Sequence, residues 1–356
     1  MVLKFDVHNA MHYVLTFAFI FVVSYVGNLY RETLATQSSD EYDLIRKYLL
    51  NDSPLYGYNK PKLWIHTKYE YNARVWESFG SRSSTNLNQP FIHLCIKSII
   101  GNCSDDFNIV LIDDEAFSKI IPNWDIDDIT SLAEPMRTRV REVGLATLLY
   151  IYGGMVVPNT FVCTQPLYDL YNDGTDKNKF FVFENINNTC SKTRDGRTQT
   201  FVPDNFFMGA KKDNLVVRNY IDYIKLHGFH PHSSGDFEFN TNLVYWFNDK
   251  QSQGEVNIVN GALIGVKDKK KRPVMIEDLF EEDYLPLHPN IYGVYIPGDR
   301  VLLRHKYNWF AAISEIELLS QNAFICKVMA SAIMNANDAY PEKHVGGEVV
   351  SNVVSI

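Results

Sequence analysis

The sequence predicts an α/β fold built on a mainly parallel sheet, and three observations support this prediction. Short apolar runs alternate with longer segments of helical character, which implies crossover helices on both faces of a sheet. One helical segment ends at Gly153-Gly154, and an apolar run follows at once. A glycine stop followed directly by a strand is a typical joint of α/β sheets, where the backbone approaches a ligand. The length of 356 residues is enough to bury a real core.

The individual elements follow from apolar runs and from the residues that start and stop helices. The run Asn108–Ile112 is apolar enough for a buried parallel strand. The helix at 135–152 has proline in its first turn and Gly153 as its stop. The predicted strands are residues 62–67, 108–112, the run between Gly154 and Pro158, 180–184 and 206–210. The predicted helices are residues 90–100, 135–152, 215–226 and 309–334.

A long apolar segment precedes this domain. No charged side chain lies between Asp6 and Arg31, and residues 13–30 are almost wholly apolar. About 20 helical residues are needed to cross a bilayer, so residues 1–30 are predicted to form a single-pass membrane anchor. A cleaved signal peptide and a buried core helix are the alternatives, although few basic residues precede the apolar run.

The rest of the chain divides by composition. Residues 31–60 are polar and are predicted to form a stalk, residues 61–334 the folded domain, and residues 335–356 a loosely ordered tail. The formal charge of −8, from 42 acidic and 34 basic side chains, argues against a nucleic-acid partner. Such a partner is usually bound by a basic face that neutralises its phosphates.

Four segments of the domain carry a resemblance to a known family. They are residues 62–66, 90–98, 110–114 and 149–154. In order and spacing they resemble the first half of the glycosyltransferases that include capsular polysaccharide synthesis-like proteins and the DXD-containing sugar-transfer enzymes. The resemblance covers residues 61–170 well. It is fainter in residues 206–211 and in 305–309, which resembles a closing His-x-x-Ser-Trp element with Asn308 in place of serine.

The resemblance implies a GT-A type nucleotide-binding fold and a nucleotide-sugar donor, such as a UDP- or GDP-sugar. It also implies Mn²⁺ or Mg²⁺, because a hard divalent cation neutralises the charge that develops on the leaving diphosphate. The implied reaction is transfer of a sugar, as by a hexosyltransferase, to a glycan or glycoprotein acceptor. Large DNA viruses carry similar proteins, so a viral source fits the resemblance, and either a host endomembrane or a viral membrane fits the anchor.

The metal-binding motif of that family is degenerate here. The resemblance places its two aspartates at Pro158 and Thr160, with Asn159 between them, and none of the three is a carboxylate. Neutral oxygens bind a divalent cation weakly when no anionic ligand accompanies them. The predicted metal ligands are therefore Asp114, from the end of the preceding strand, together with Asn159 and Asn308.

A second acidic motif of the family, Ser-Asp-x-x-Arg, falls on residues 141–145. Glu142 replaces its acid, but Leu145 cannot replace its arginine. In a metal-independent transferase, arginines such as Arg141 would stabilise the diphosphate instead. The alternative for these arginines is a solvated helix face. Metal dependence is therefore in doubt.

Three residues are candidates for catalysis: Asp113, Asp114 and His305. The two aspartates directly follow a predicted strand, and the alternative is that one of them caps the next helix. The resemblance places His305 and Trp309 over the diphosphate as a lid. The alternative for this pair is a corner of the fold that Trp309 packs.

The predicted substrate-binding residues lie mostly at the ends of predicted strands. The resemblance places a nucleobase beside Trp64 and His66, and the alternatives are core packing of Trp64 and a hydrogen-bonded, non-catalytic His66. The full predicted set is Trp64, His66, Arg141, Glu142, Gly153, Gly154, Asn159, Thr160 and Trp309.

Two functions are open at this point. The first is a membrane-anchored glycosyltransferase. The second is a glycosyltransferase-like domain that has lost turnover and serves as a binding or structural part, for example at a membrane or in a virus particle.

Overall fold

The computed structural model describes residues 60–67, 89–126, 128–189, 191–193, 195–229 and 235–339, with side chains to residue 334. All of them belong to the second of two compact units of the chain, Ser53–Ile356. The predicted anchor, the stalk up to residue 59 and the tail from residue 340 lie outside the described residues. Within the described residues, no helix combines the length and the apolar character needed to cross a membrane.

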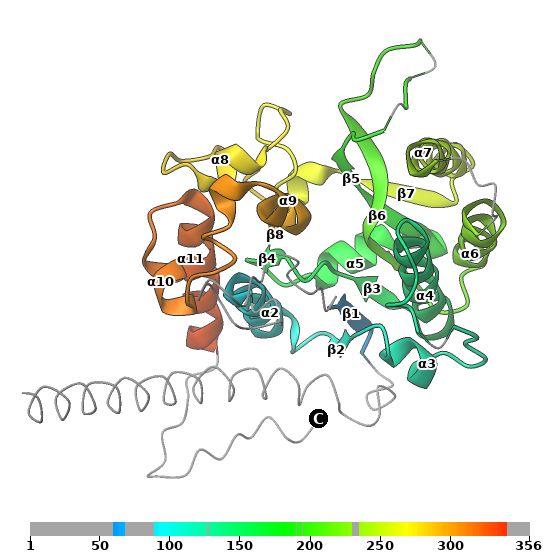
Figure 1. Cartoon of the computed structure of the whole chain (residues 1–356), viewed down its shortest axis with the longest axis horizontal. Coiled ribbons are helices and arrows are strands. Elements are labelled where there is room, and N and C mark those ends of the chain that lie inside the picture. The colour runs from blue at the N-terminus through cyan, green and yellow to red at the C-terminus, as the bar shows by residue number, and fades with distance from the viewer. Residues whose placement is uncertain are drawn as a thin grey trace, which may run out of the picture. The chain divides into compact units, whose positions relative to one another are not determined.

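A mixed, mostly parallel sheet forms the centre of the described domain (Figure 1). Its strands, in spatial order, are β2 (Asn108–Ile112), β1 (Lys62–His66), β3 (Gly154–Val156), β6 (Phe201–Ala210), β5 (Phe180–Ile186) and β7 (Val256–Val259). β6 is antiparallel to β3 and to β5, whereas the other pairings in this sheet are parallel. The structure thus has the α/β class and the mainly parallel sheet that the sequence predicts.

The helices and short helical turns follow the order of the chain. The α-helices of the described residues are α2 (Pro90–Cys103), α3 (Ala116–Ile120), α4 (Met136–Tyr152), α5 (Tyr168–Gly174), α6 (Leu215–Gly228), α7 (Asp236–Ser252), α8 (Ile276–Phe280), α9 (Gly298–Leu303), α10 (Glu315–Ser320) and α11 (Phe324–Ala339). Single 3₁₀ turns occupy Asp176–Asn178, Gly261–Ile264 and His305–Tyr307.

Helices cover both faces of the sheet. On one face, α4, α6 and α7 lie against the strands (Figure 1), and a shared apolar core joins Val143 of α4 and Tyr220 of α6 to Met208 of β6. On the other face, Tyr171 of α5 packs edge-on against Phe181 of β5, with the ring centres 6.5 Å apart. Burial of apolar surface on both faces explains why the strands read as nearly continuous apolar runs.

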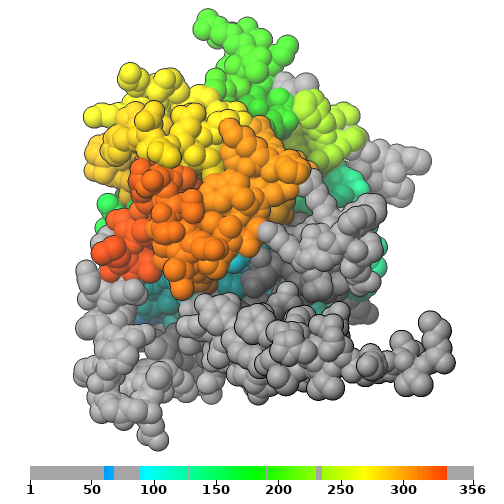
Figure 2. Space-filling view, turned by 60° about the vertical axis from the view of Figure 1, so that its left-hand side comes forward, coloured from blue at the N-terminus to red at the C-terminus, as the bar shows by residue number. Residues whose placement is uncertain are grey.

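A second apolar core lies beside the sheet. β4 (Phe161–Cys163) pairs antiparallel with β8 (Gly293–Tyr295), and Val162 and Val294 of these strands pack with Phe91 of α2 and Met329 of α11. Figure 2 shows the segments from about residue 260 to residue 330, yellow to red, packed together on one face of the domain. This second core holds the C-terminal third of the domain against α2.

The predicted helix at 309–334 is two helices in the structure, α10 and α11, preceded by a turn. Gln321, the C-cap of α10, has extended backbone with φ −74° and ψ 149°, and it separates the two helices. Ser314 sets the start of α10. Its backbone is extended, with φ −66° and ψ 161°, and it forms a capping box with Glu317. An N-cap residue with extended backbone starts a new helix and cannot continue an earlier one. The other predicted elements are present, with β5, β6 and α6 longer than predicted, and α2 runs through Gly101, its predicted stop, to Cys103.

Candidate functional site

The candidate residues gather at one edge of the sheet, where the parallel strands have their carboxyl ends. β1 ends at His66 and β2 at Ile112, which lie opposite each other, and β5 ends at Ile186. Because β6 runs the other way, its first residues lie at this same edge, beyond the end of β3. The chain passes from β1 to β2 and then returns to β3 on the other side of β1. This edge is therefore a topological switch point, where α/β sheets bind ligands.

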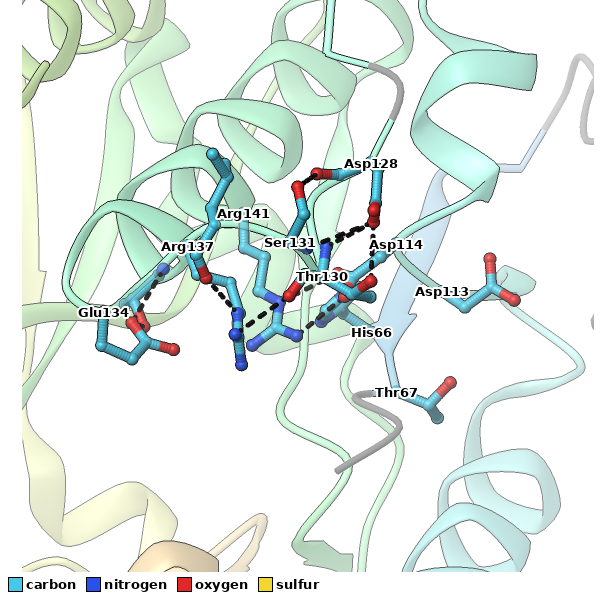
Figure 3. A network of polar contacts seen from close by, with 12 residues as sticks. His66, Thr67, Asp113, Asp114, Asp128, Thr130, Ser131, Glu134, Arg137 and Arg141 are labelled. Carbon is cyan, nitrogen blue, oxygen red and sulfur yellow. Dashed lines mark hydrogen bonds and ion pairs between the residues drawn. The ribbon is translucent and has the colours of Figure 1, made fainter. Parts of the chain in front are cut away.

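His66, Asp114 and Arg141 form a closed polar cluster at this edge (Figure 3). Arg141 donates from Nε to Oδ1 of Asp114 at 2.9 Å and from Nη2 to Oδ2 at 2.7 Å. Nε2 of His66 forms a hydrogen bond of 3.0 Å with the same Oδ1. The side chains of His66, Asp114 and Arg141 are 7%, 11% and 6% exposed. The cluster therefore fastens α4 to the ends of β1 and β2.

The surroundings of Asp114 keep its carboxyl group ionised. Burial raises the pKa of Asp114, but the hydrogen bonds and charges of His66 and Arg141 lower it more, so this pKa lies well below its usual range. Both carboxylate oxygens accept hydrogen bonds, and a cation bound to Asp114 would have to displace Arg141. In the described part of the chain, no three His, Cys, Asp or Glu side chains group closely enough to hold a metal ion. These donors do not fit the predicted metal.

Asp113 points away from the cluster (Figure 3) and caps the next helix. Its Oδ1 accepts the backbone N–H of Ala116, the first residue of α3, at 2.9 Å. Of the two alternatives for the aspartate pair, Asp113 thus has the capping role and Asp114 the ion-pair role. The structure does not bring the two carboxylates together at one reacting centre.

Trp64, Gly153 and Gly154, which are predicted to contact substrate, pack against other parts of the fold, and for Trp64 this matches the alternative of core packing. Trp64 is 0% exposed, and its indole N–H donates to the carbonyl of Gly153 at 3.0 Å. A ring without exposed area cannot stack on a nucleobase. At Gly154, with φ +106°, a Cβ atom would lie 2.0 Å from the carbonyl oxygen of Lys62. Gly154 is therefore required because it allows β3 to approach β1 closely, whereas a Cβ at Gly153 would lie 2.7 Å from the backbone nitrogen of Lys212.

Residues 158–160, at the position of the degenerate motif, connect the large sheet to the small one. Thr160 is 8% exposed, and its hydroxyl donates to the carbonyl of Ile296 at 2.7 Å. The backbone N–H of Ile296 donates in return to the carbonyl of Thr160 at 3.1 Å. Asn159 is partly buried beside it. Thr160 is thus already engaged in holding the end of β8.

The predicted lid residues lie in a turn between α9 and α10. His305 is exposed, and Trp309 is 36% exposed. The Trp309 ring packs edge-on against Phe280, with ring centres 5.9 Å apart, and also against Phe310. Asn308 follows the same 3₁₀ turn. This arrangement matches the alternative in which Trp309 packs a corner of the fold, and none of the three residues lines the cavity described next.

A cavity of about 460 Å³ opens at the carboxyl edge, over β5, β6 and α4. Thr138, Glu142 and Leu145 line it from one face of α4, as their spacing on a helix requires. The two positions to which the resemblance assigns the acid and the arginine of its second motif therefore both face this cavity. The polar side chains that line it include Thr138, Glu142, Asn185, Asn188, Asp204, Asn205, Asn240, Tyr295, Asp299 and Arg300.

A bulge in β6 places several of these side chains. Val182 of β5 pairs with Met208, but the next residue, Phe183, pairs with Asp204. Residues 205–207 thus have no partner in register, and such bulges turn side chains toward sites beside a sheet. Asn205 donates to the hydroxyl of Tyr220 at 2.6 Å.

Three carboxyl groups line the cavity: Glu142 from α4, Asp204 from the bulge and the exposed Asp299 from α9. Burial, together with the charges of Asp204 and Asp236, raises the pKa of Glu142 to about 7, although Asn205 and Arg139 act in the opposite direction. Burial also raises the pKa of Asp204 against the hydrogen bonds of Asn185 and of the backbone at 205 and 206. Raised carboxyl pKa values in a cavity are typical of functional sites.

Sequence reasoning missed most of this cavity. It proposed Glu142, but not Asp204, Asn185, Tyr295 or Arg300. These side chains come from different strands and from α9, and a bulge with shifted register brings them together. The signal that was present is the polar pair Asp204-Asn205 directly before an apolar run.

No protein-family model and no curated protein matches the chain. Solved structures resemble it weakly. The glycosyltransferase GlyE of Streptococcus pneumoniae matches over 57% of this chain, at 13% identity and a TM-score of 0.32, and the match spans 46% of that protein. A Bacillus anthracis protein described as a glucose-1-phosphate thymidylyltransferase, in complex with sucrose, matches over 56% of this chain and 86% of its own, at 10% identity and a TM-score of 0.32.

A further solved structure, the PaToxG glycosyltransferase, matches over 55% of this chain and 73% of its own, at 10% identity and a TM-score of 0.27. This chain therefore spans less than half the length of the first of these proteins. Two of the three are glycosyltransferases and one is a nucleotidyltransferase. TM-scores this low carry no argument about function, which has to come from the residues of the cavity.

Proposed function

We propose that this protein is a nucleotide-sugar-dependent sugar-transfer enzyme whose ligand site is the cavity at the carboxyl edge of the sheet. One observation carries the proposal: this cavity combines carboxyl groups, amides and a basic side chain at the carboxyl edge of the sheet. The edge of an open α/β sheet is where nucleotide ligands bind. The GT-A type of fold, which the sequence motifs suggest, is part of this proposal.

The cavity has the size and the lining that a sugar requires. Its volume of about 460 Å³ lies within the range of roughly 300–1,000 Å³ that is usual for small-molecule sites. The amides of Asn185, Asn205 and Asn240 can both donate to and accept from hydroxyl groups. The rings of Phe206 and Tyr295, with centres 4.6 Å apart, offer an apolar wall to the C–H face of a sugar.

The diphosphate of the donor would be met by Arg300. Among the described residues that line the cavity, Arg300 is the one basic side chain, and it donates to Oδ1 of Asn188 at 2.7 Å. A guanidinium group suits phosphate oxygens because it donates in a fixed fork. Since the donors at Asp114 and at residues 158–160 do not fit Mn²⁺ or Mg²⁺, the proposed reaction has no step that passes through a metal.

Donor binding tests the proposal. Isothermal titration of the protein with a panel of UDP- and GDP-sugars is expected to give saturable binding of at least one donor. Arg300→Ala should weaken this binding, whereas Lys306→Ala, at an exposed position outside the cavity, is the matched control. Absence of binding to every donor in the panel would contradict the proposal.

A second candidate is a glycosyltransferase-like binding or structural protein without turnover. The specific observation in its favour is the state of the family's acidic positions: residues 158–160 carry no carboxylate, and Asp114 is neutralised by Arg141. Donor binding without release of nucleoside diphosphate would favour this candidate.

The cellular context is proposed from the sequence. Residues 13–30 are apolar and long enough to cross a bilayer, so we infer that they anchor the domain to a membrane of a host cell or of a virus. The acceptor is then a glycan or glycoprotein at that membrane. The capsular polysaccharide type and the viral source belong to the same proposal and rest on the sequence motifs alone.

A further inference from the structure

Glu142 and Asp204, the two less exposed carboxyl groups of the cavity, differ in what their oxygens contact. Asp204 is satisfied: Oδ2 accepts from the Asn185 amide at 2.8 Å, and Oδ1 accepts the backbone N–H of Phe206 at 3.3 Å. Oε2 of Glu142 is shielded from solvent and has no hydrogen-bond partner within the described part of the chain. An unpaired buried oxygen costs free energy, and because Glu142 lines the cavity, a small movement of its side chain would bring this oxygen to a hydrogen on a ligand.

The charges around Glu142 come from every element that packs against it. Asp204 approaches from β6 and Asp236 from the first turn of α7, both negative, while Arg139 from its own helix is positive. Tyr220 of α6 also faces Glu142 and is deeply buried. Because two carboxyl groups oppose a single guanidinium, the surroundings favour a Glu142 that readily takes up a proton.

We propose that Glu142 is the general base of the reaction and that the negative charge of Asp204 in the same cavity tunes it, an inference that rests on the proposed function. In one step, the acceptor oxygen bonds to the anomeric carbon of the donor sugar, and its O–H bond breaks as Oε2 of Glu142 takes the proton. The bond from the anomeric carbon to the phosphate oxygen breaks, and its electron pair leaves with the nucleoside diphosphate. A single displacement of this kind inverts the anomeric configuration.

Other carboxylates are less suited to this role. A base must reach the proton with a free lone pair. Both oxygens of Asp114 are held by Arg141 and His66, and both oxygens of Asp204 accept hydrogen bonds within the protein. Asp299 lines the cavity, but its side chain is exposed to solvent rather than enclosed with the reacting groups. Glu142 thus combines access to the cavity with an unoccupied oxygen.

The test compares the full-length protein with its Glu142→Gln variant in release of nucleoside diphosphate from UDP- and GDP-sugars. Water serves as the acceptor, so the natural acceptor need not be known. The variant is expected to bind donor as the wild type does and to lose about 10²–10⁴-fold in kcat, the usual contribution of a general base. Thermal unfolding of both proteins verifies that the variant is folded.

The pH profile separates a base from a structural role. Wild-type kcat is expected to rise with pH with a midpoint near 7, as Glu142 ionises. Asp204→Asn removes a charge that raises the Glu142 pKa, so the midpoint of the kcat profile should move to lower pH. A purely structural Asp204 would lower kcat without moving the midpoint, and this result would overturn its tuning role.

The outcomes distinguish the inference from the function on which it rests. Donor binding by the wild type with undiminished turnover in Glu142→Gln would overturn the base role and leave the proposed function standing. Donor binding without any turnover in the wild type would overturn the base role and favour the binding protein. If no donor binds, the proposed function fails first. Retention of the anomeric configuration in the product would also overturn the single displacement.

Discussion

The polar cluster of His66, Asp114 and Arg141 and the cavity around Glu142 use the same kind of residue in opposite ways. Arg141 and Glu142 are neighbours on α4, yet Arg141 joins a closed network in which each oxygen of Asp114 is engaged. Glu142 faces a cavity with Oε2 unpaired. Accordingly, the pKa of Asp114 is lowered and the pKa of Glu142 is raised.

This difference in hydrogen bonding indicates which carboxyl groups at this sheet edge can take part in a reaction. A carboxylate with all its lone pairs engaged is a fixed part of the scaffold, because any ligand would have to compete with a bidentate guanidinium. A carboxyl group with a free oxygen and a pKa near neutrality can exchange a proton during a reaction. The closed cluster therefore serves the fold, and the open cavity is the proposed ligand site.

The largest expected effect on stability comes from breaking the ion pair in the closed cluster. Asp114→Asn leaves the buried Arg141 without its anionic partner, and removing one partner of a buried pair costs about 3–5 kcal/mol of unfolding free energy. Since the folded pKa of Asp114 is lowered, its stabilisation is present above the unfolded pKa of about 3.9 and is lost as pH falls toward the folded value. The difference in unfolding free energy between wild type and variant should therefore become smaller at acid pH.

Urea unfolding at neutral and acid pH measures this gap. Glu115→Gln is a suitable control because Glu115 lies one residue away with its side chain 82% exposed. A loss below about 1 kcal/mol for Asp114→Asn, the value of a surface pair, would show that the cluster does not hold the fold.

A somewhat smaller effect on stability is expected at the open cavity, and there the substitution stabilises the protein. Because the pKa of Glu142 rises from 4.5 to about 7 on folding, the folded state holds its proton more tightly, and the wild type loses stability as pH rises between these values. Glu142→Gln removes this loss, which amounts to about 3 kcal/mol. Chemical unfolding at pH 5 and pH 8 should show a stability gap between variant and wild type that grows with pH. A gap that is constant with pH would contradict the raised pKa.

Asp113 should give a modest effect on stability and none on ligand binding. Asp113→Ala removes the hydrogen bond to the N–H of Ala116, and loss of a helix cap usually costs about 0.5–2 kcal/mol. Nucleotide-sugar affinity, measured by titration calorimetry, is expected to remain at the wild-type value. A clear loss of affinity in a folded Asp113→Ala protein would place this carboxylate in the ligand site.

Much of the fold could be predicted from the sequence, because its signals are local. The apolar run Asn108–Ile112 is β2 with the predicted bounds, and the proline and glycine that bound the segment 135–152 also bound α4. The long helix predicted at 309–334 failed because apolar character hid the capping box of Ser314 and Glu317. A cap is a single-residue signal, which a search for apolar periodicity does not detect.

The sequence predicts individual residues of the candidate site, but not which of these side chains contact one another. His66, Asp114 and Arg141 were each proposed to bind substrate, metal or reacting groups, yet their mutual pairing depends on how β1, β2 and α4 meet. Asp204 was missed because its place in the cavity depends on the register shift of β6 against β5. Contacts between elements distant in sequence are set by packing, and a single sequence does not contain them explicitly.

The smallest expected effect is that of a divalent cation on donor affinity. If the open cavity binds the diphosphate through Arg300, donor affinity measured by calorimetry should be the same in EDTA and in Mn²⁺ or Mg²⁺. The double variant Asp113→Asn/Asp114→Asn, provided that it folds, should also keep this affinity, because neither carboxylate lines the cavity. A donor that binds in Mn²⁺ and is released by EDTA would require anionic ligands. If the double variant abolished that dependence, the closed cluster would have to open when the donor binds, and the division between scaffold and ligand site would fail.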